Sequence, residues 1–178
     1  MTTTTAPAPI RTRGHTITTT VPSPIGPLTL ARRDGDLVAV RMEDQRHLSG
    51  VEPDWVRDDD GFGDVAEQLR AYFAGERTTF DLATRIEGTP FQADVWEALR
   101  DIPFGQTISY AELACRVGRP AAVRAVGQAN GRNPLAVVIP CHRVVAADGS
   151  LGGYGGGLDR KRWLLDHEGA HDTWSDRA

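Results

Sequence analysis

A cysteine, a histidine and an arginine stand together after an apolar run, and these residue types can support chemistry on a thiol. Cys141, His142 and Arg143 follow Pro140, and the run 137–139 before the proline is Val-Val-Ile. A cysteine reacts as the thiolate, which a nearby base or cation promotes. The commonest fate of an intracellular cysteine is burial as a small apolar side chain. From this stretch alone, a reactive thiol and a packed core cysteine both remain open.

The residues around the cysteine suggest how it is positioned. The branched apolar run predicts a short buried extended segment, and Pro140 must bend the chain because it fixes its own φ. Successive residues of an extended chain point to opposite faces. We therefore expect no direct contact between Cys141 and His142, so that a water molecule or a bend must connect them.

Composition limits the class of protein. The chain has 178 residues, of which 40% are hydrophobic and 25% charged, enough for one domain or two small ones. It has no apolar run of about 18 residues, and residues 1–9 lack the apolar stretch of a signal peptide. Two cysteines, Cys115 and Cys141, are too few for a disulfide scaffold. We expect a cytoplasmic protein with free thiols and no membrane partner.

Metal and charge give two further expectations. Residues 1–88 contain no cysteine and only two histidines, His15 and His47, so we expect no structural metal there. The net charge is −4, yet residues 113–147 hold five arginines and no acid (116, 119, 124, 132 and 143). Such a local basic field can serve a polyanion, and a solvated charged face explains it equally well.

The first half of the chain predicts a small α+β domain over residues 15–85, after a disordered tail at 1–14. The turn residues at 34–36 indicate a hairpin, and Gly75 ends the predicted helix. Residues 43–60 are polar and irregular. The expected elements are strands at 16–21, 28–32, 37–42 and 79–82, and a helix at 63–74.

The second half predicts a mainly helical domain over residues 89–170, followed by a frayed tail at 171–178. Thr89 before Pro90 is typical of a helix start, and Ser109 stands at capping-box distance from Glu112. The helices at 110–116 and 121–130, joined by a glycine-containing turn, favour a helix-turn-helix or an ordinary αα-hairpin. The expected helices are 90–99, 110–116, 121–130 and 158–167.

The run 139–144 resembles the signature of the O6-alkylguanine-DNA alkyltransferases, also called methylated-DNA–protein-cysteine methyltransferases. The resemblance covers about residues 89–169, and the N-terminal half matches only loosely. Its other motifs lie at 89–92, 95–96, 108–110, 124–127, 133–134, 152–154, 156–158 and 163–169.

The resemblance implies an α/β protein with two domains. A ribonuclease-H-like α+β domain would precede a helix-turn-helix, winged-helix-like domain that binds DNA and carries the active site. The implied function is DNA repair by irreversible, single-turnover transfer of the alkyl group from O6-alkylguanine, and from O4-methylthymine, to a cysteine. The damaged base is the alkyl donor, so no cofactor is expected. The implied partner is double-stranded DNA, bound by a monomer or cooperatively.

The resemblance also implies roles for the residues around the thiol. Cys141 would be the nucleophile, with Glu168, His142 and a water molecule forming a proton relay. Asn133 would brace the turn before the active-site segment, although a loop asparagine explains the residue as well. The hydroxyl of Tyr110 would donate toward guanine N3, the alternative being a core tyrosine.

Further implied roles concern the DNA. The carbonyls of Cys141 and Val144 would accept from the guanine amine, and an amide near Tyr154 and Gly155 would donate to O6. Because the target atom lies inside the duplex, the base must be flipped out. Arg124 would replace it in the stack, with the small residues Ala125 and Gly127 allowing a close approach to the minor groove. A solvated helix arginine is the alternative reading of Arg124.

Three other functions remain alternatives. A non-catalytic lesion-binding module would keep the pocket without the transfer, although such proteins lack the cysteine. A transcriptional regulator would use the helix-turn-helix, but usually with a further cysteine-rich domain. A thiol hydrolase would use the same residue types and turn over many substrates.

Overall fold

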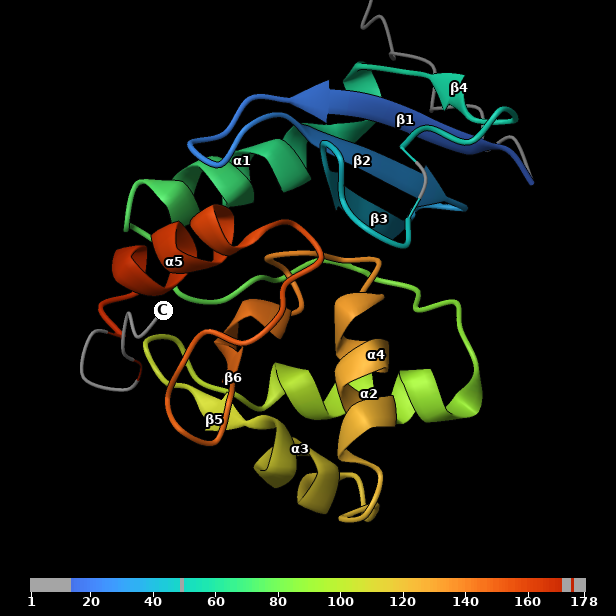
Figure 1. Ribbon diagram of the computed structural model, residues 1–178. Coiled ribbons are helices and arrows are strands. Elements are labelled where there is room, and N and C mark those ends of the chain that lie inside the picture. The colour runs from blue at the N-terminus through green and yellow to red at the C-terminus, as the bar shows by residue number, and fades with distance from the viewer. Residues whose placement is uncertain (1–13, 49, 171–173, 175–178) are drawn as a thin grey trace, which may run out of the picture.

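The computed structural model describes residues 14–48, 50–170 and 174. The tails predicted at 1–14 and 171–178 lie outside the described residues, apart from Gly14 and Trp174. The chain forms a sheet with one helix and then a helical part, the order that the sequence predicts (Figure 1). None of the helices in the described ranges has the length and apolar content needed to span a membrane.

The first part is a four-stranded sheet with the order β3-β2-β1-β4. The first three strands pair antiparallel, and β4 pairs parallel with β1. Its elements are β1 (Thr16–Val21), β2 (Leu28–Arg33), β3 (Asp36–Met42), β4 (Val56–Arg57), a 3-10 turn η1 (Asp60–Phe62) and α1 (Gly63–Phe73).

Two expectations for this part are wrong. Residues 79–82 form no strand, and the neighbouring Thr84 instead makes a single bridge to Leu37 of β3. The short strand β4 was not predicted because it lies in the polar segment and both of its residues are exposed. A two-residue strand on a sheet edge buries too little surface to leave a periodic pattern in the sequence.

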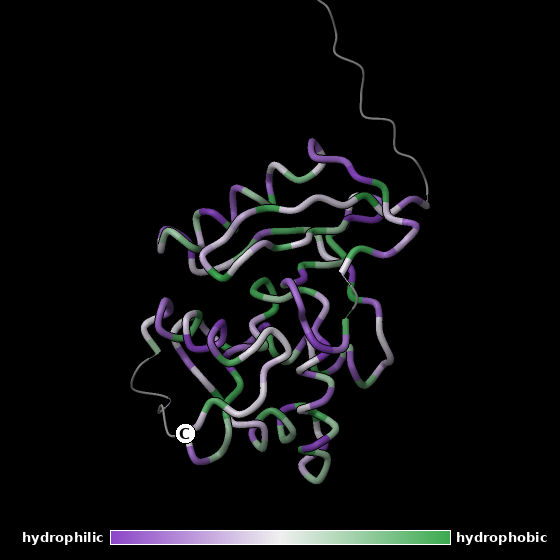
Figure 2. Tube along the Cα trace, turned by 45° about the horizontal axis from the view of Figure 1, so that its top comes forward, coloured by the Kyte–Doolittle hydropathy of each residue, from purple (hydrophilic) through white to green (hydrophobic). Residues whose placement is uncertain are grey.

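Helix α1 covers the sheet and connects it to the rest of the molecule. Val65, Leu69 and Tyr72 are buried along one side of α1. They belong to a hydrophobic core that also contains Leu30 of the sheet and Leu99 of the helical part. Figure 2 shows apolar and polar residues alternating along the elements of both parts. The two parts therefore share one core.

The second part contains α2 (Pro90–Arg100), α3 (Tyr110–Arg116), α4 (Val123–Gly131) and α5 (Leu158–His167). The predicted cap of α2 is confirmed, because Thr89 and Gln92 form a reciprocal capping box. The Ser109 side chain accepts a hydrogen bond from the Glu112 amide and caps α3. Helix α4 begins at Val123 rather than Ala121, after a turn in which the Ala122 amide bonds to the Arg119 carbonyl.

The edge strand β3 connects the sheet to the segment that leads to the cysteine. The Val40 amide donates to the Pro134 carbonyl at 2.8 Å, and the Ala136 amide donates to the Val40 carbonyl at 3.0 Å. These bonds satisfy backbone groups that an uncovered edge would leave unpaired. The sheet thereby fixes the position of residues 134–136.

The run before Cys141 is buried as predicted, but it is a turn and not an extended segment. Val137 has a φ of 71°, and the Val138 amide bonds to the Ala136 carbonyl at 2.9 Å. A positive φ is unfavourable for a β-branched residue, so the surrounding bonds must hold it. Asn133 supplies two of them, from its Nδ2 to the Ile139 carbonyl at 2.8 Å and from the Leu135 amide to its Oδ1 at 3.0 Å.

Candidate active site

The turn delivers Cys141 into a short 3-10 helix, η2 (Cys141–Arg143), which leads into strand β6 (Val144–Val145). Strand β6 pairs parallel with β5 (Ile108–Ser109), two short strands that were not predicted. Cys141, His142 and Arg143 are all buried in η2. The bend expected at Pro140 is therefore a helical turn, in which consecutive side chains diverge.

The thiol of Cys141 lies in a site that keeps it protonated. Burial raises its pKa, while hydrogen bonds from Asn133 and Tyr154 and the charge of Lys161 act in the opposite direction. The Sγ atom lies 4.0 Å from the hydroxyl of Tyr154. A thiol with a raised pKa needs a base before it can act as a nucleophile at neutral pH.

His142 has the geometry of such a base. It is completely buried, and its Nε2 lies 2.9 Å from Oε1 of Glu168. Burial lowers the pKa of His142, so the imidazole is neutral, and the carboxylate can only accept a hydrogen bond. Nε2 must therefore carry the proton. The other nitrogen, Nδ1, is a buried acceptor that has no hydrogen-bond partner among the described residues.

Glu168 is held by an unusual number of donors. Arg143 donates from Nε to Oε2 and from Nη2 to Oε1, each at 2.8 Å. Tyr72 donates to Oε1 at 2.6 Å, and the Gly105 amide donates to Oε2 at 3.3 Å. Burial alone would raise the pKa of the carboxyl, but hydrogen bonds from His142 and Arg143 and the charge of Arg143 hold this pKa far below its usual range. Glu168 is therefore ionised.

The ion pair of Arg143 changes the expected basic surface. Arg143 is buried against Glu168, and Arg116 pairs with Glu112 at 2.7 Å on α3. The exposed arginines of the basic stretch outside these pairs are Arg119, Arg124 and Arg132. The positive field predicted from five arginines thus rests mainly on three.

A cavity of about 520 Å³ opens beside the cysteine. Its walls include Tyr110, Arg124, Gly127, Asn130, Tyr154 and Gly155. Cys141 lies behind Asn130 and Tyr154, which both contact it. Burial raises the pKa of Tyr110 to about 12, and its hydroxyl donates to the Gly153 carbonyl at 3.0 Å. The cavity therefore places a neutral hydroxyl donor near the thiol.

The two carbonyls predicted to bind guanine already accept hydrogen bonds. Asn130 Nδ2 donates to the Cys141 carbonyl at 3.3 Å, and Lys161 Nζ donates to the Val144 carbonyl at 2.6 Å. Lys161 is completely buried and also donates to the carbonyls of Leu151 and Gly153. Burial lowers the pKa of Lys161 to about 8. The Cys141 carbonyl also accepts from the Val144 amide, so both of its lone pairs are engaged, and a guanine amine would have to share or replace one of these donors.

Helix α4 carries the residues predicted to meet DNA. Arg124 is exposed and lines the cavity, and Gly127 lies against the ring of Tyr110. Ala125 is also exposed but is not part of the cavity wall. At Gly155 an added Cβ would come within 2.9 Å of the Gly131 carbonyl oxygen. Gly155 thus allows the loop after β6 to pack against the end of α4.

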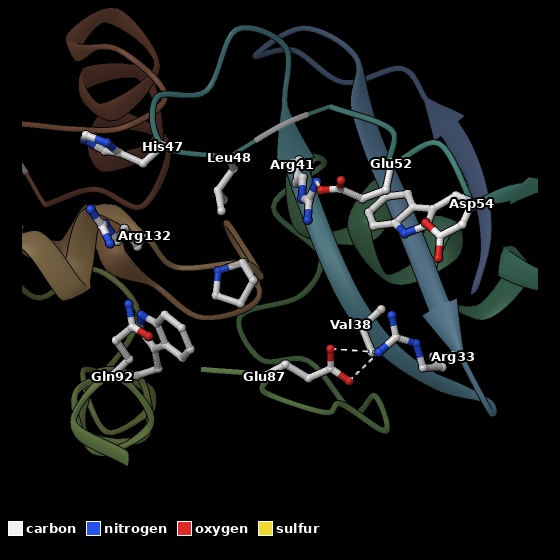
Figure 3. Close-up of a pocket in the computed structure, with 13 residues that line it drawn as sticks. Arg33, Val38, Arg41, His47, Leu48, Glu52, Asp54, Glu87, Gln92 and Arg132 are labelled. Carbon is white, nitrogen blue, oxygen red and sulfur yellow. Dashed lines mark hydrogen bonds and ion pairs between the residues drawn. The ribbon is translucent and has the colours of Figure 1, made fainter. Parts of the chain in front are cut away.

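A second cavity, of about 370 Å³, lies between the sheet and the helical part (Figure 3). Its charged side chains largely pair with one another, such as Arg33 with Glu87 at 2.7 Å and Arg41 with Glu52 at 3.0 Å. Neither Cys141 nor His142 lines it. Across the described ranges, no group of three or more His, Cys, Asp and Glu side chains could hold a metal ion.

Sequence reasoning missed three residues of the site: Tyr72, Asn130 and Lys161. The sequence pattern predicts that Tyr72 is a core residue of an amphipathic helix and that Lys161 is a charged residue on the exposed side of a helix. Asn130 looks like a helix-end residue. No local pattern distinguishes these residues, because their partners lie far away in the sequence or on the backbone.

The fold and the site together define a helix-turn-helix protein that holds a buried thiol and a buried imidazole behind the second helix of the motif. Residues 90–170 match the DNA-binding domain model of 6-O-methylguanine DNA methyltransferase, and residues 16–86 match the ribonuclease-like domain model of the same family. The chain belongs to the 6-O-methylguanine DNA methyltransferase family. The predicted family and fold class are confirmed.

Similar proteins cover nearly the whole chain. A methylated-DNA–protein-cysteine methyltransferase of Mycolicibacterium paratuberculosis is 54% identical, over 88% of this chain and 94% of the relative. One from Methanosarcina acetivorans is 47% identical, over 83% of this chain and 95% of the relative. The crystal structure of Mycobacterium tuberculosis OGT in complex with DNA matches with a TM-score of 0.81 and 49% identity, over 88% of this chain and 93% of that one.

Proposed function

We propose that this protein repairs DNA directly by moving the alkyl group of O6-alkylguanine to Cys141. The observation that carries the proposal is the buried His142, whose Nε2 faces Glu168 while its Nδ1 remains an unpaired acceptor among the described residues. Such an imidazole can take the thiol proton, and Glu168 stabilises the imidazolium that results. The proton passes through a water molecule, because η2 directs Cys141 and His142 apart.

The transfer is a displacement at the alkyl carbon. The thiolate of Cys141 forms the new S–C bond as the C–O6 bond breaks, and the bonding electron pair leaves with the guanine. The base leaves as an anion, which a hydrogen bond from the neutral Tyr110 hydroxyl toward N3 stabilises, and water then protonates it. A thioether is a poor leaving group, so each molecule acts once and needs no cofactor. O4-methylthymine presents the same alkyl–oxygen bond and is a second substrate.

The substrate reaches the cavity as a flipped-out base in double-stranded DNA. Arg124, exposed on α4 at the cavity edge, replaces the base in the stack. Gly127, and Ala125 on the exposed side of α4, let the helix approach the minor groove. Inside the cavity, the carbonyls of Cys141 and Val144 accept from the guanine amine. The Gly155 amide donates to O6. The protein carries out this reaction as a monomer in the cytoplasm.

Mass spectrometry of the intact protein tests the transfer. After incubation with a duplex oligonucleotide that holds one O6-methylguanine, we expect a gain of one methyl group, located on Cys141 by peptide mapping. Cys115→Ser should accept the methyl group as the wild type does, since Cys115 is exposed on α3 and does not line the cavity. Cys141→Ser should gain none.

Other outcomes would contradict the proposal in distinct ways. An adduct on Cys115 would exclude Cys141 as the acceptor. Binding of the lesion without an adduct would indicate a lesion-binding module, and repair of many lesions by each molecule would indicate a hydrolase.

A further inference from the structure

Tyr72 brings the N-terminal part of the molecule into the relay. It lies on α1, is completely buried, and donates from its hydroxyl to Oε1 of Glu168 at 2.6 Å. The same oxygen accepts from Nε2 of His142 at 2.9 Å. A residue of the sheet-bearing part is thus two hydrogen bonds away from the proposed base.

The position of the Tyr72 hydroxyl is rigid. Its ring packs against Phe73, Phe80 and Phe104, with centroid distances of 5.2, 5.4 and 6.1 Å. His167 lies 5.2 Å from the ring and contacts the Tyr72 carbonyl through Nε2 at 2.7 Å. Aromatic packing of this kind surrounds the ring and directs the hydroxyl toward Glu168.

The hydrogen bond has a chemical consequence beyond packing. Each donor to a carboxylate disperses its negative charge and favours its ionised form. A carboxylate with dispersed charge attracts an adjacent imidazolium less strongly. Oε1 accepts from Tyr72, His142 and Arg143 together, so Tyr72 and Arg143 both compete with His142 for the charge of one oxygen.

Other charged or titratable side chains also lie around the relay, on η2 and α5. Burial is the main cause that lowers the pKa of His142, and Glu168 raises it. The charges of Arg143 in η2 and Lys161 in α5 lower this pKa further. Cys141 lies on the same turn, and His167 of α5 contacts Tyr72 rather than Glu168. Besides the Gly105 amide and the neutral imidazole of His142 itself, Tyr72 is the uncharged donor to Glu168 among the described residues. Its hydroxyl can therefore be removed without changing the net charge of the site.

We propose that Tyr72 is a positioning residue for alkyl transfer, whose hydroxyl orients Glu168 and limits how strongly that carboxylate favours the protonated form of His142. The proposal rests on the proposed function, in which Cys141 is the acceptor and His142 its base. Without the hydroxyl, His142 becomes more basic and the thiol ionises at lower pH. The N-terminal part of the molecule thus adjusts the reactivity of a cysteine in the C-terminal part.

The pH dependence of Cys141 alkylation tests this role without DNA. In the full chain with Cys115→Ser, the rate of reaction with iodoacetamide is measured across the neutral and alkaline range. Tyr72→Phe should move the midpoint to lower pH by about half a unit, which raises the rate below the midpoint about threefold. Tyr72→3-fluorotyrosine, a stronger donor of similar size, should move the midpoint to higher pH.

Opposite shifts from two variants at one position separate the proposed role from structural damage. Thr18→Val is the matched control, because Thr18 also donates a buried hydroxyl in the sheet, to the Leu30 carbonyl at 2.7 Å, far from the relay. Its midpoint should equal that of the parent. Unchanged midpoints in both Tyr72 variants, shifts in the same direction, or an equal shift in Thr18→Val would overturn the proposal.

The two proposals fail separately. If the wild type takes no methyl group from DNA, the proposed function is refuted, whatever pH profile iodoacetamide gives. If the wild type takes the methyl group and the midpoints of the Tyr72 variants do not move, only the role of Tyr72 falls. Should Tyr72→Phe fail to fold, the fluorotyrosine variant alone decides, since its shift must be toward higher pH.

Discussion

At the scale of single residues, the site depends on one ionised carboxylate with many partners. Glu168 joins Tyr72, Gly105, His142 and Arg143, which come from three separate stretches of the chain. Burying a charge is costly unless it is paired and hydrogen-bonded. Removal of Glu168 would leave Arg143 as an uncompensated buried charge, so the carboxylate stabilises the fold as well as the relay.

Glu168→Gln should lower the free energy of unfolding at neutral pH by about 3 kcal/mol. The folded pKa of Glu168 is depressed, so its contribution is complete above the ordinary carboxyl pKa of about 4.3. As the pH falls further, toward the depressed folded pKa, that contribution is progressively lost. Denaturant titrations of wild type and variant at several pH values should therefore show a difference that shrinks in acid.

The matched control for this prediction is Glu112→Gln. Glu112 pairs with Arg116 at 2.7 Å on the surface of α3, where an ion pair contributes little. Its effect should stay below about 0.5 kcal/mol at neutral pH. If the free energies of unfolding of the wild type and Glu168→Gln differ by the same amount at all pH values, the assignment of an ionised, stabilising carboxylate is wrong.

At the scale of elements, the molecule places its chemistry behind helix α4. The Asn130 side chain near the end of α4 reaches the Cys141 carbonyl, while Arg124 near its start is exposed. One helix thus contacts the backbone of Cys141, the proposed nucleophile, and also lines the solvent side of the cavity. The turn at Val137 and the bonds of Asn133 fix the thiol relative to this helix.

Arg124→Ala should reduce repair of O6-methylguanine in duplex DNA by about tenfold or more, because flipping a base out of the stack costs a few kcal/mol. Reaction with the free alkylated base should change little, because no base has to leave a duplex. Single-turnover rates on both substrates give the comparison. Arg162→Ala, which removes an arginine paired with Asp159 on α5, should leave both rates unchanged. Equal losses on the two substrates would exclude the flipping role.

The sequence predicted the residues of this site that a continuous stretch or a family motif places together. Cys141, His142, Asn133 and Glu168 come together in the structure. The conformation of Val137 could not be predicted, because a β-branched residue disfavours a positive φ and only tertiary hydrogen bonds impose it. The bonds from Tyr72 and Lys161 depend on distant partners, which periodicity does not reveal.

At the scale of the whole molecule, the sheet and the helical part behave as one body. They share the core, the backbone bonds from Val40 to Pro134 and Ala136, and the Tyr72–Glu168 hydrogen bond. Domains joined by small polar interfaces move and unfold separately, whereas a buried apolar interface couples them. The arrangement explains why the N-terminal part can matter for a thiol that it does not carry.

We expect a single cooperative unfolding transition for the full chain. Thermal melts followed by far-ultraviolet circular dichroism and by tryptophan fluorescence should coincide, since Trp55 and Trp96 report on the two parts. Two separate transitions would show that the shared core does not couple the parts.

The bond between Tyr72 and Glu168 also concerns how the protein is made. The two residues are 96 positions apart, and closing so long a stretch of chain is entropically costly and slow. A ribosome releases the N-terminal part first, so the sheet and α1 can fold before the rest emerges. Cys141 then leaves the ribosome ahead of Glu168. A nascent chain that ends between them carries the thiol without its carboxylate, so the proposed relay is complete only when Glu168, directly after α5, has been synthesised and α5 has packed against α1.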